Sequence, residues 1–305
     1  MVRQAMAELY ERGKEAVKYT LRNERQWLAW YRSSIFRGSG RWLAGITDHL
    51  YGKFEFIDNE LYELALRIRL LSGPDLQWDM CALCLGIPFH GEKALHHLNC
   101  RAGQDYWRRR HEEVCDLVAG FVKKMGLRPL LEYQLPPIQQ AVSGTPTAAA
   151  IPQEGVSTEE GLGHTGVVEG PVQEPATEPV QTKHRADVFY YRTTGTLQSV
   201  LIDVTVANPS APSYASAAPE EKDDATAIAR ETEKRRRYDQ FKNVHEIVPF
   251  VVEATGRLGP TAIEWMKEIS KKQKYKRSSF REQIGVKVIQ ACMQQINRLT
   301  KQAAI

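Results

Sequence analysis

DVFYYR (187–192), TTGT (193–196) and LQSVLIDVTV (197–206) predict a β-hairpin in the second half of the chain. Both outer runs are rich in β-branched and aromatic residues, and the glycine in TTGT favours a turn between them. In the second run, alternate side chains point to opposite faces of a sheet. The apolar residues at 200, 202, 204 and 206 share one face, and Leu201, Asp203 and Thr205 share the other.

The residues after the hairpin indicate further helices and one more strand. A helix is expected over about 219–243, with acidic residues first and basic residues later, as the helix dipole favours. EIVPFVVEATG (246–256) is typical of a buried strand, and helices follow near 260–273 and 279–302. This order of hairpin, helix, strand and helix predicts an α/β (α+β) core.

The residues before the hairpin are expected to be mostly helical. Helical patterns cover 3–36, 58–71 and 103–126, and a cysteine-rich loop lies at 78–100. No stretch approaches the roughly 20 apolar residues that a membrane-spanning helix needs, so we expect no membrane span. The helical pattern therefore predicts a helical region ahead of the α/β core.

A segment of different composition, residues 139–182, lies between the helix expected over 103–126 and the hairpin. It contains 6 Glu, 6 Gly and 5 Pro, and it has no Lys, Arg or aromatic residue. Such a composition predicts disorder, because little apolar surface is available for burial. The rest of the chain holds 41 basic and 31 acidic residues, a net charge of +10. That excess favours a polyanionic partner such as nucleic acid, although a merely soluble basic surface would explain it equally well.

The cysteine-rich loop has the spacing of a zinc site. Two residues separate Cys81 from Cys84, as in a Cys-x2-Cys motif, and a histidine and Cys100 follow 12–16 residues after Cys84. His97 is preferred as the fourth ligand because it keeps a Leu-x-His-Leu pattern, while His96 and His90 remain alternatives. The structural alternative is that Cys81 and Cys84 are buried thiols at a helix–loop corner. Cys115 and Cys292 fall on apolar helical faces and are expected to be core residues.

Two aspartates in the predicted hairpin suggest a second kind of metal site. Asp187 begins one strand and Asp203 lies inside the next, where an unpaired carboxylate would be costly. Paired carboxylates can bind Mg²⁺, and Lys234 could orient a metal-bound water or stabilise charge on a phosphate. Tyr238 lies four residues after Lys234 and so shares its helical face. A strand-end role for Asp187 and a solvated face for KRRR (234–237) are the structural alternatives.

The order of these motifs resembles the C-terminal region of site-specific non-LTR retrotransposons, which joins a CCHC zinc knuckle to a PD-(D/E)xK restriction-like endonuclease. The matching motifs, which span about 56–275, are the knuckle Cys81, Cys84, His97 and Cys100, the Arg-His pair Arg110-His111, the strand Arg185-Ala186-Asp187-Val188, the stretch Asp203–Pro209, the basic helix Lys234–Tyr238 and the strand Val248–Gly256. The resemblance implies a restriction-endonuclease-like core preceded by a helical zinc-knuckle region. Its divisions would be a helical region (1–77), the knuckle (78–102), the endonuclease with its acidic insert (103–275) and a C-terminal helix (276–305).

The resemblance also implies a function, which is metal-dependent nicking of DNA to prime reverse transcription. Structural Zn²⁺ and catalytic Mg²⁺ or Mn²⁺ would be the cofactors, and DNA the partner, with element RNA and a separate reverse transcriptase as further candidates. A eukaryotic element would act in the nucleus. The implied catalytic residues are Asp187, Asp203, Lys234 and Tyr238. The implied nucleic-acid-binding residues are Arg110, His111, Arg185, Arg235, Arg236 and Arg237.

Several departures from the family pattern bear on activity. Ala186 replaces the family's proline, and Thr205 stands where a restriction enzyme has its lysine, so activity would depend on Lys234. The family's further carboxylate corresponds to Glu132 or Glu178. No polymerase signature is present in the chain. The alternatives are therefore a catalytically inactive nucleic-acid-binding relic and a protein-binding scaffold.

Overall fold

The computed structural model describes residues 2–35, 39–40, 43, 59–70, 81, 84, 95–96, 98–135, 184–192, 199–271 and 277–302. The acidic segment 139–182, the predicted turn 193–196, His90, His97 and Glu178 lie outside these described residues.

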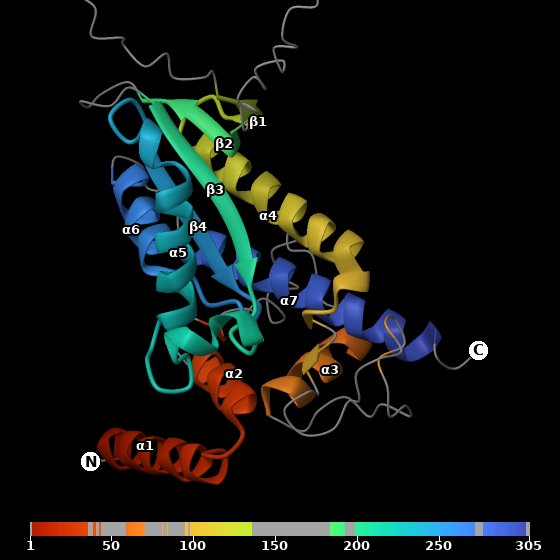
Figure 1. The fold of residues 1–305 in the computed structure, drawn as a ribbon. Coiled ribbons are helices and arrows are strands. Elements are labelled where there is room, and N and C mark those ends of the chain that lie inside the picture. The colour runs from red at the N-terminus through yellow and green to blue at the C-terminus, as the bar shows by residue number, and fades with distance from the viewer. Residues whose placement is uncertain are drawn as a thin grey trace, which may run out of the picture.

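A four-stranded mixed sheet forms the centre of the fold (Figure 1). Its strands, β1 (Leu130–Gln134), β2 (Arg185–Tyr191), β3 (Ser199–Ala207) and β4 (Glu246–Glu253), lie side by side in chain order. The first three are antiparallel, and β4 runs parallel to β3 after a crossover through α5 (Ala225–Arg237). The predicted hairpin and the mixed α/β class are confirmed, whereas β1 was not predicted.

Helices α4, α5 and α6 pack against the sheet, and further helices lie around them and beyond its end (Figure 1). The described helices are α1 (Val2–Thr20), α2 (Arg25–Ile35), α3 (Asn59–Arg69), α4 (Gln104–Lys124), α5, α6 (Pro260–Ile269) and α7 (Arg277–Gln302), with short 3₁₀ turns η4 (Arg101–Gly103), η5 (Pro212–Ala217) and η6 (Asp239–Phe241). None of the described helices is long and apolar enough to cross a membrane.

Two of the predicted helices are shorter than expected. The single helix predicted over 3–36 is broken at 21–24, where Leu21 is buried and Asn23 lies in a turn, a position that asparagine favours. The helix predicted over 219–243 begins only at Ala225. The acidic residues before it form turns, and Asp224 takes a left-handed conformation with φ of 62°.

The alternation predicted for β3 is confirmed. Val200, Ile202 and Val204 belong to the main core, which also contains apolar residues of α4, α6 and α7. On the other face, Leu201 packs with Phe189 and Tyr238 in a smaller cluster. The sheet is therefore buried on both faces, and α5 covers the face opposite the main core.

The N-terminal part is joined to the core through buried polar groups. The hydroxyl of Ser33 in α2 donates a hydrogen bond to the carboxylate of Glu253 at the end of β4, and it also contacts the Thr255 hydroxyl. Complete burial raises the pKa of Glu253, although Arg257 and Ser33 oppose the rise. This contact holds α2 close to the carboxyl end of β4.

One edge of β3 loses its neighbour halfway along the strand. β4 pairs with β3 from Val200 to Ala207, whereas the described pairing of β2 with β3 covers only 199–202. From Asp203 onward, therefore, the edge of β3 that faces away from β4 is not part of a ladder with β2. This divergence of β2 from β3 opens the space in which the candidate site lies.

Candidate functional site

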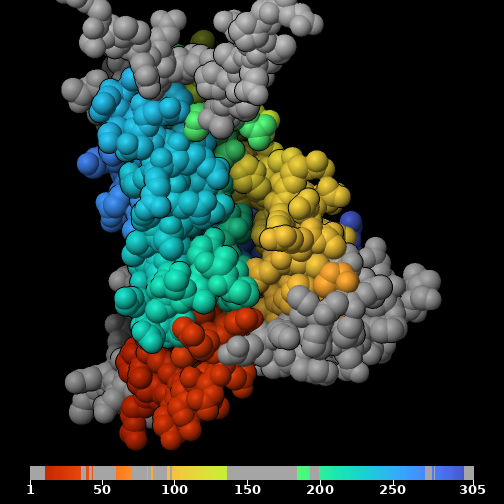
Figure 2. All heavy atoms as spheres, in the orientation of Figure 1, coloured from red at the N-terminus to blue at the C-terminus, as the bar shows by residue number. Residues whose placement is uncertain are grey.

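A cleft of about 760 Å³ lies between α4 and α5, with the open edge of β3 at its base. Figure 2 shows the molecule hollowed here, between α5 in cyan and α4 in yellow. All residues of β3 from Asp203 to Ala207 line the cleft, since side chains of both faces and the backbone are accessible at an unpaired edge. The four residues predicted to be catalytic, Asp187, Asp203, Lys234 and Tyr238, are all among the residues that line it.

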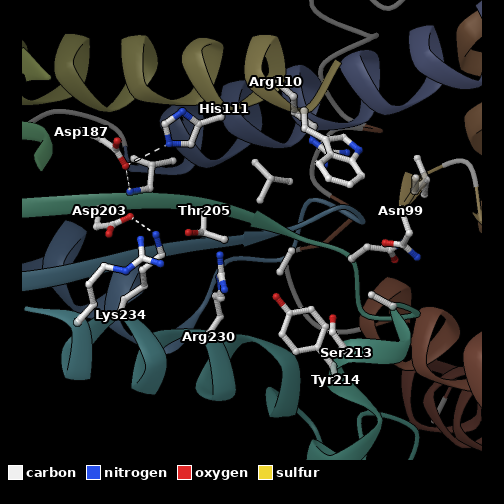
Figure 3. Close-up of a pocket in the computed structure, with 18 of the residues that line it drawn as sticks. Asn99, Arg110, His111, Asp187, Asp203, Thr205, Ser213, Tyr214, Arg230 and Lys234 are labelled. Atoms are coloured by element: carbon white, nitrogen blue, oxygen red, sulfur yellow. Dashed lines mark hydrogen bonds and ion pairs between the residues drawn. The ribbon is translucent and has the colours of Figure 1, made fainter. Parts of the chain in front are cut away.

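Asp203 and Lys234 form a buried ion pair on the α5 side of the cleft (Figure 3). The Nζ atom of Lys234 lies 2.5 Å from Oδ1 of Asp203, and both side chains are buried. Lys234 stands in the last turn of α5, the crossover helix, so the β3–α5–β4 connection itself brings the ammonium over β3. The geometry joins two residues that lie 31 positions apart in the chain.

Asp187 occupies the opposite side of β3, near α4. Its Oδ2 atom accepts a hydrogen bond of 2.7 Å from the backbone amide of Val204 and one of 3.1 Å from Nε2 of His111. The carboxylate therefore bonds an amide of β3 at the point where the β2–β3 ladder has stopped. His111 comes from the middle of α4, so this contact also joins that helix to the sheet.

The surroundings of the two carboxylates drive their pKa values apart. Burial acts to raise the pKa of Asp187, but the hydrogen bonds and charge of His111, together with the Val204 amide, lower it overall. Burial raises the pKa of Asp203, and repulsion from Asp187 adds to that rise while Lys234 opposes it. The hydrogen bond to Asp187 raises the pKa of His111 despite its burial. Paired carboxyl groups with opposite shifts are typical of acid–base or metal sites, although structural ion pairs also produce such shifts.

Tyr238 supports the site from the end of α5. Its hydroxyl donates a 2.6 Å hydrogen bond to the backbone carbonyl of Arg185 in β2, so it links α5 to the strand that carries Asp187. Burial and the nearby charge of Asp203 raise the pKa of Tyr238. In this arrangement the phenol stays protonated and its hydrogen bond to the backbone holds the two elements together.

The predicted nucleic-acid-binding residues have different surroundings. Arg185 lines the cleft and pairs with Glu132 at 2.9 Å, while Arg110 is 5% exposed and contacts Sγ of Cys292 in α7. Among the three arginines at 235–237, Arg237 lines the cleft. Arg235 instead donates to Thr261 of α6, at 3.1 Å.

Glu132, one of the two candidates for a further carboxylate, is not one of the cleft residues. Its side chain is more than half exposed and pairs with Arg185. Its backbone has a φ of +53°, opposite Asp187 in the β1–β2 register, which marks a local distortion of the sheet.

The cysteine-rich loop brings four metal-capable side chains together. The ligand atoms of Cys81, Cys84, His96 and Cys100 all lie within 4.8 Å of one another. The Sγ atoms of Cys81 and Cys100 are 3.8 Å apart, and Cys84 Sγ lies 3.4 Å from His96 Nε2. Tetrahedral zinc with bonds of about 2.3 Å to sulfur and 2.0–2.1 Å to nitrogen gives edges of roughly 3.6–3.8 Å. These four residues therefore fit a tetrahedral metal ion.

Among the described residues, the histidine of this cluster is His96, one of the alternatives to His97. The sequence analysis preferred His97, which lies outside the described residues, because of the leucines on either side of the pair. Leu95 and Leu98 are indeed both buried, and His96 next to Leu95 supplies the nitrogen. The leucine pattern identified a buried corner but could not say which histidine faces the thiols.

A second group of metal-capable side chains lies in the wall of the cleft and was not predicted as a group. It consists of His111, Cys115 and Asp187, whose ligand atoms lie within 4.8 Å of one another. Cys115 was expected to be a core residue, and it is indeed 7% exposed within the main core. Its position four residues after His111 on α4 is the local signal that could have indicated the contact.

The far end of the cleft is formed by residues that the sequence analysis did not single out. Trp107 of α4, Arg230 of α5, Asn208 after β3 and Tyr214 of η5 all contribute to it. Arg230 and Arg110 approach from opposite walls (Figure 3). Aromatic, amide and guanidinium groups together suit a ligand with phosphates and planar rings.

A comparison with protein-family models finds no match for this chain, and a comparison with curated proteins finds none either.

Proposed function

We propose that the protein is a metal-dependent DNA endonuclease of the restriction-like kind, derived from a site-specific non-LTR retrotransposon. The observation that carries this proposal is the convergence of Asp187, Asp203 and Lys234 in one cleft, at the open edge of β3. The sequence motif order supports it independently, because the family resemblance assigns the catalytic roles to the same three residues.

The two carboxylates suit a hard divalent cation. Mg²⁺ and Mn²⁺ prefer oxygen ligands, and Asp187 and Asp203 would hold the ion from adjacent strands. In the structure His111 contacts the Asp187 carboxylate and Lys234 pairs with the Asp203 carboxylate. A divalent cation could take over these contacts, because it carries a higher charge than either side chain. When bound, the metal would polarise the scissile phosphate and lower the pKa of an attacking water.

Lys234 takes the part that a strand lysine has in restriction enzymes. Thr205 occupies that strand position and cannot carry a positive charge. The Lys234 ammonium reaches the same carboxylate from α5, where it could orient the attacking water or stabilise charge on the phosphorane. Tyr238 would be a positioning residue, since its hydroxyl is committed to the backbone of β2.

The cleft also has the cations that a DNA backbone requires. Arg185, Arg230 and Arg237 line it, and α5 ends with four consecutive basic residues. Phosphate contacts of this type supply affinity without reading sequence. The +10 charge outside the acidic segment 139–182 is consistent with such a partner.

The zinc cluster would act by holding α4 in place. Cys100 directly precedes η4 and α4, the helix that carries His111. A metal at Cys81, Cys84, His96 and Cys100 would therefore fix the start of the wall that contacts Asp187. In a retrotransposon, the nick would prime DNA synthesis in the nucleus by a separate reverse transcriptase acting on element RNA.

The test is a nicking assay on supercoiled duplex DNA with Mg²⁺ or Mn²⁺. The wild-type protein is expected to convert supercoiled to open circular DNA. Asp187→Asn and Asp203→Asn should abolish the conversion, whereas Glu264→Gln, an exposed carboxylate on α6, should not. The absence of any metal-dependent nicking by wild-type protein would refute the proposal.

A nucleic-acid-binding relic is the second candidate, and one observation favours it. Among the described residues, the metal-capable groups of three or more within 4.8 Å do not include Asp203. A relic would bind DNA in a salt-dependent manner, with the same affinity in Asp203→Asn, and would nick none.

A further inference from the structure

We propose that His111, Cys115 and Asp187 form a second metal site, selective for Zn²⁺ and similar soft divalent ions, in the wall of the cleft. A thiolate, an imidazole and a carboxylate are the ligand types that tetrahedral zinc takes in proteins. The inhibitory consequence described below rests on the proposed function, whereas metal binding itself does not.

The distances between the three side chains match the edges of a tetrahedral zinc site. Nε2 of His111 lies 3.1 Å from Oδ2 of Asp187, and it lies 3.7 Å from Sγ of Cys115. Zinc bonds of about 2.0–2.1 Å to nitrogen, 2.0–2.2 Å to oxygen and 2.3 Å to sulfur place these atom pairs roughly 3.4 and 3.6 Å apart. Sγ of Cys115 is also 3.7 Å from Nδ1 of His111, so a rotation of the imidazole or of the Cys115 side chain, together with shifts of a few tenths of an ångström, would complete three corners.

The backbone holds the three ligands in this arrangement. His111 and Cys115 are four residues apart on α4 and so project from the same face of the helix. Asp187 is fixed from the other side, because its carboxylate accepts the Val204 amide. Ligands on rigid elements lose little conformational freedom when the metal binds, which favours affinity.

Access and charge also suit this site. The His111 side chain is 31% exposed and lines the cleft, so an ion and a water at the fourth position can enter from solvent. A thiolate and a carboxylate would neutralise Zn²⁺ in surroundings that are largely apolar around Cys115. Mg²⁺ would not compete for the thiolate, because hard cations take oxygen ligands.

The position of Asp187 in both proposed sites makes the two metals mutually exclusive. A soft ion held by His111 and Cys115 would engage Asp187 and withdraw it from the pair that holds Mg²⁺. We therefore infer that excess Zn²⁺ inhibits nicking, and that removal of the Cys115 thiol weakens this inhibition.

The experiment is a metal titration of the reduced, metal-free 305-residue chain with Zn²⁺ against a chromophoric chelator. It is repeated with Co²⁺, whose thiolate charge-transfer absorption reports sulfur ligation. Wild type is expected to bind two equivalents, one at the four-ligand cluster and one at the second site. Cys115→Ala should bind one equivalent fewer and lose part of the thiolate absorption. Cys292→Ala, a buried thiol outside both groups, should match wild type.

Equal metal stoichiometry in wild type and Cys115→Ala would overturn the proposal. Circular dichroism establishes that both variants are folded, and His111→Ala provides a second test by removing the nitrogen ligand. In the nicking assay, Zn²⁺ should inhibit Cys115→Ala at least about tenfold less potently than wild type. If the protein nicks no DNA, the proposed function fails, while the difference in metal stoichiometry still decides the second site.

Discussion

Replacing Lys234 with methionine is expected to destabilise the protein by about 3–5 kcal/mol, because it leaves the buried carboxylate of Asp203 without its counter-charge. The two side chains are 7% and 4% exposed, and Nζ lies 2.5 Å from Oδ1. Methionine keeps most of the apolar stem of lysine, so the loss measures removal of the charge and not a large cavity.

The assay is urea unfolding at pH 7 without added Mg²⁺, with the variant expected to unfold at lower urea and with an unchanged slope. Lys267→Met is the matched control. Its Nζ lies 2.5 Å from Glu264, but the two side chains are 47% and 70% exposed. That variant should lose no more than about 1 kcal/mol, since water screens an exposed pair.

The double variant Lys234→Met/Asp203→Leu separates the charge effect from other causes. It removes both buried charges and should recover most of the stability lost in Lys234→Met. If Lys234→Met loses no more stability than Lys267→Met, the reasoning that Asp203 depends on a buried counter-charge is wrong.

Three further changes test other parts of the structure. Protonated Glu253 stabilises the fold at low pH, and this stability is lost as pH rises from the ordinary glutamate pKa to the raised pKa of Glu253. Glu253→Gln should therefore become more stable relative to wild type across that pH range, as measured by urea unfolding. Cys84→Ala should weaken zinc binding by more than about tenfold in a chelator competition and lower the Tm. Arg237→Ala should reduce the slope of log affinity for DNA against log salt by about 0.9, while Arg236→Ala, outside the cleft, should change it less.

The parts of the fold that depend on local patterns could be predicted from the sequence. The alternation around Asp203 predicted which side chains face the main core, and the spacing of Lys234 and Tyr238 predicted a shared helical face. β1 was missed because LLEYQ is only five residues long and its partner strand, β2, begins about 50 residues later, at Arg185. Short strands with distant partners leave little local signal.

The candidate site shows the same division between local and distant contacts. The cluster of three cysteines and a histidine was predicted from cysteine spacing, although spacing alone did not single out His96 as the histidine that lies beside the described thiols. The contact of Cys115 with His111 and Asp187 was not predicted, because Cys115 also satisfies the apolar pattern of α4. Its metal-capable role depends on Asp187, which reaches α4 only through the sheet.

The measurement that tests the central claim most directly is Mg²⁺-dependent nicking by wild type and Asp203→Asn, compared side by side on the same supercoiled DNA. Both proteins should bind the DNA, and only wild type should nick it. Equal nicking by the two proteins, or binding without nicking by wild type, would contradict the account of Asp203 as a ligand of the catalytic metal.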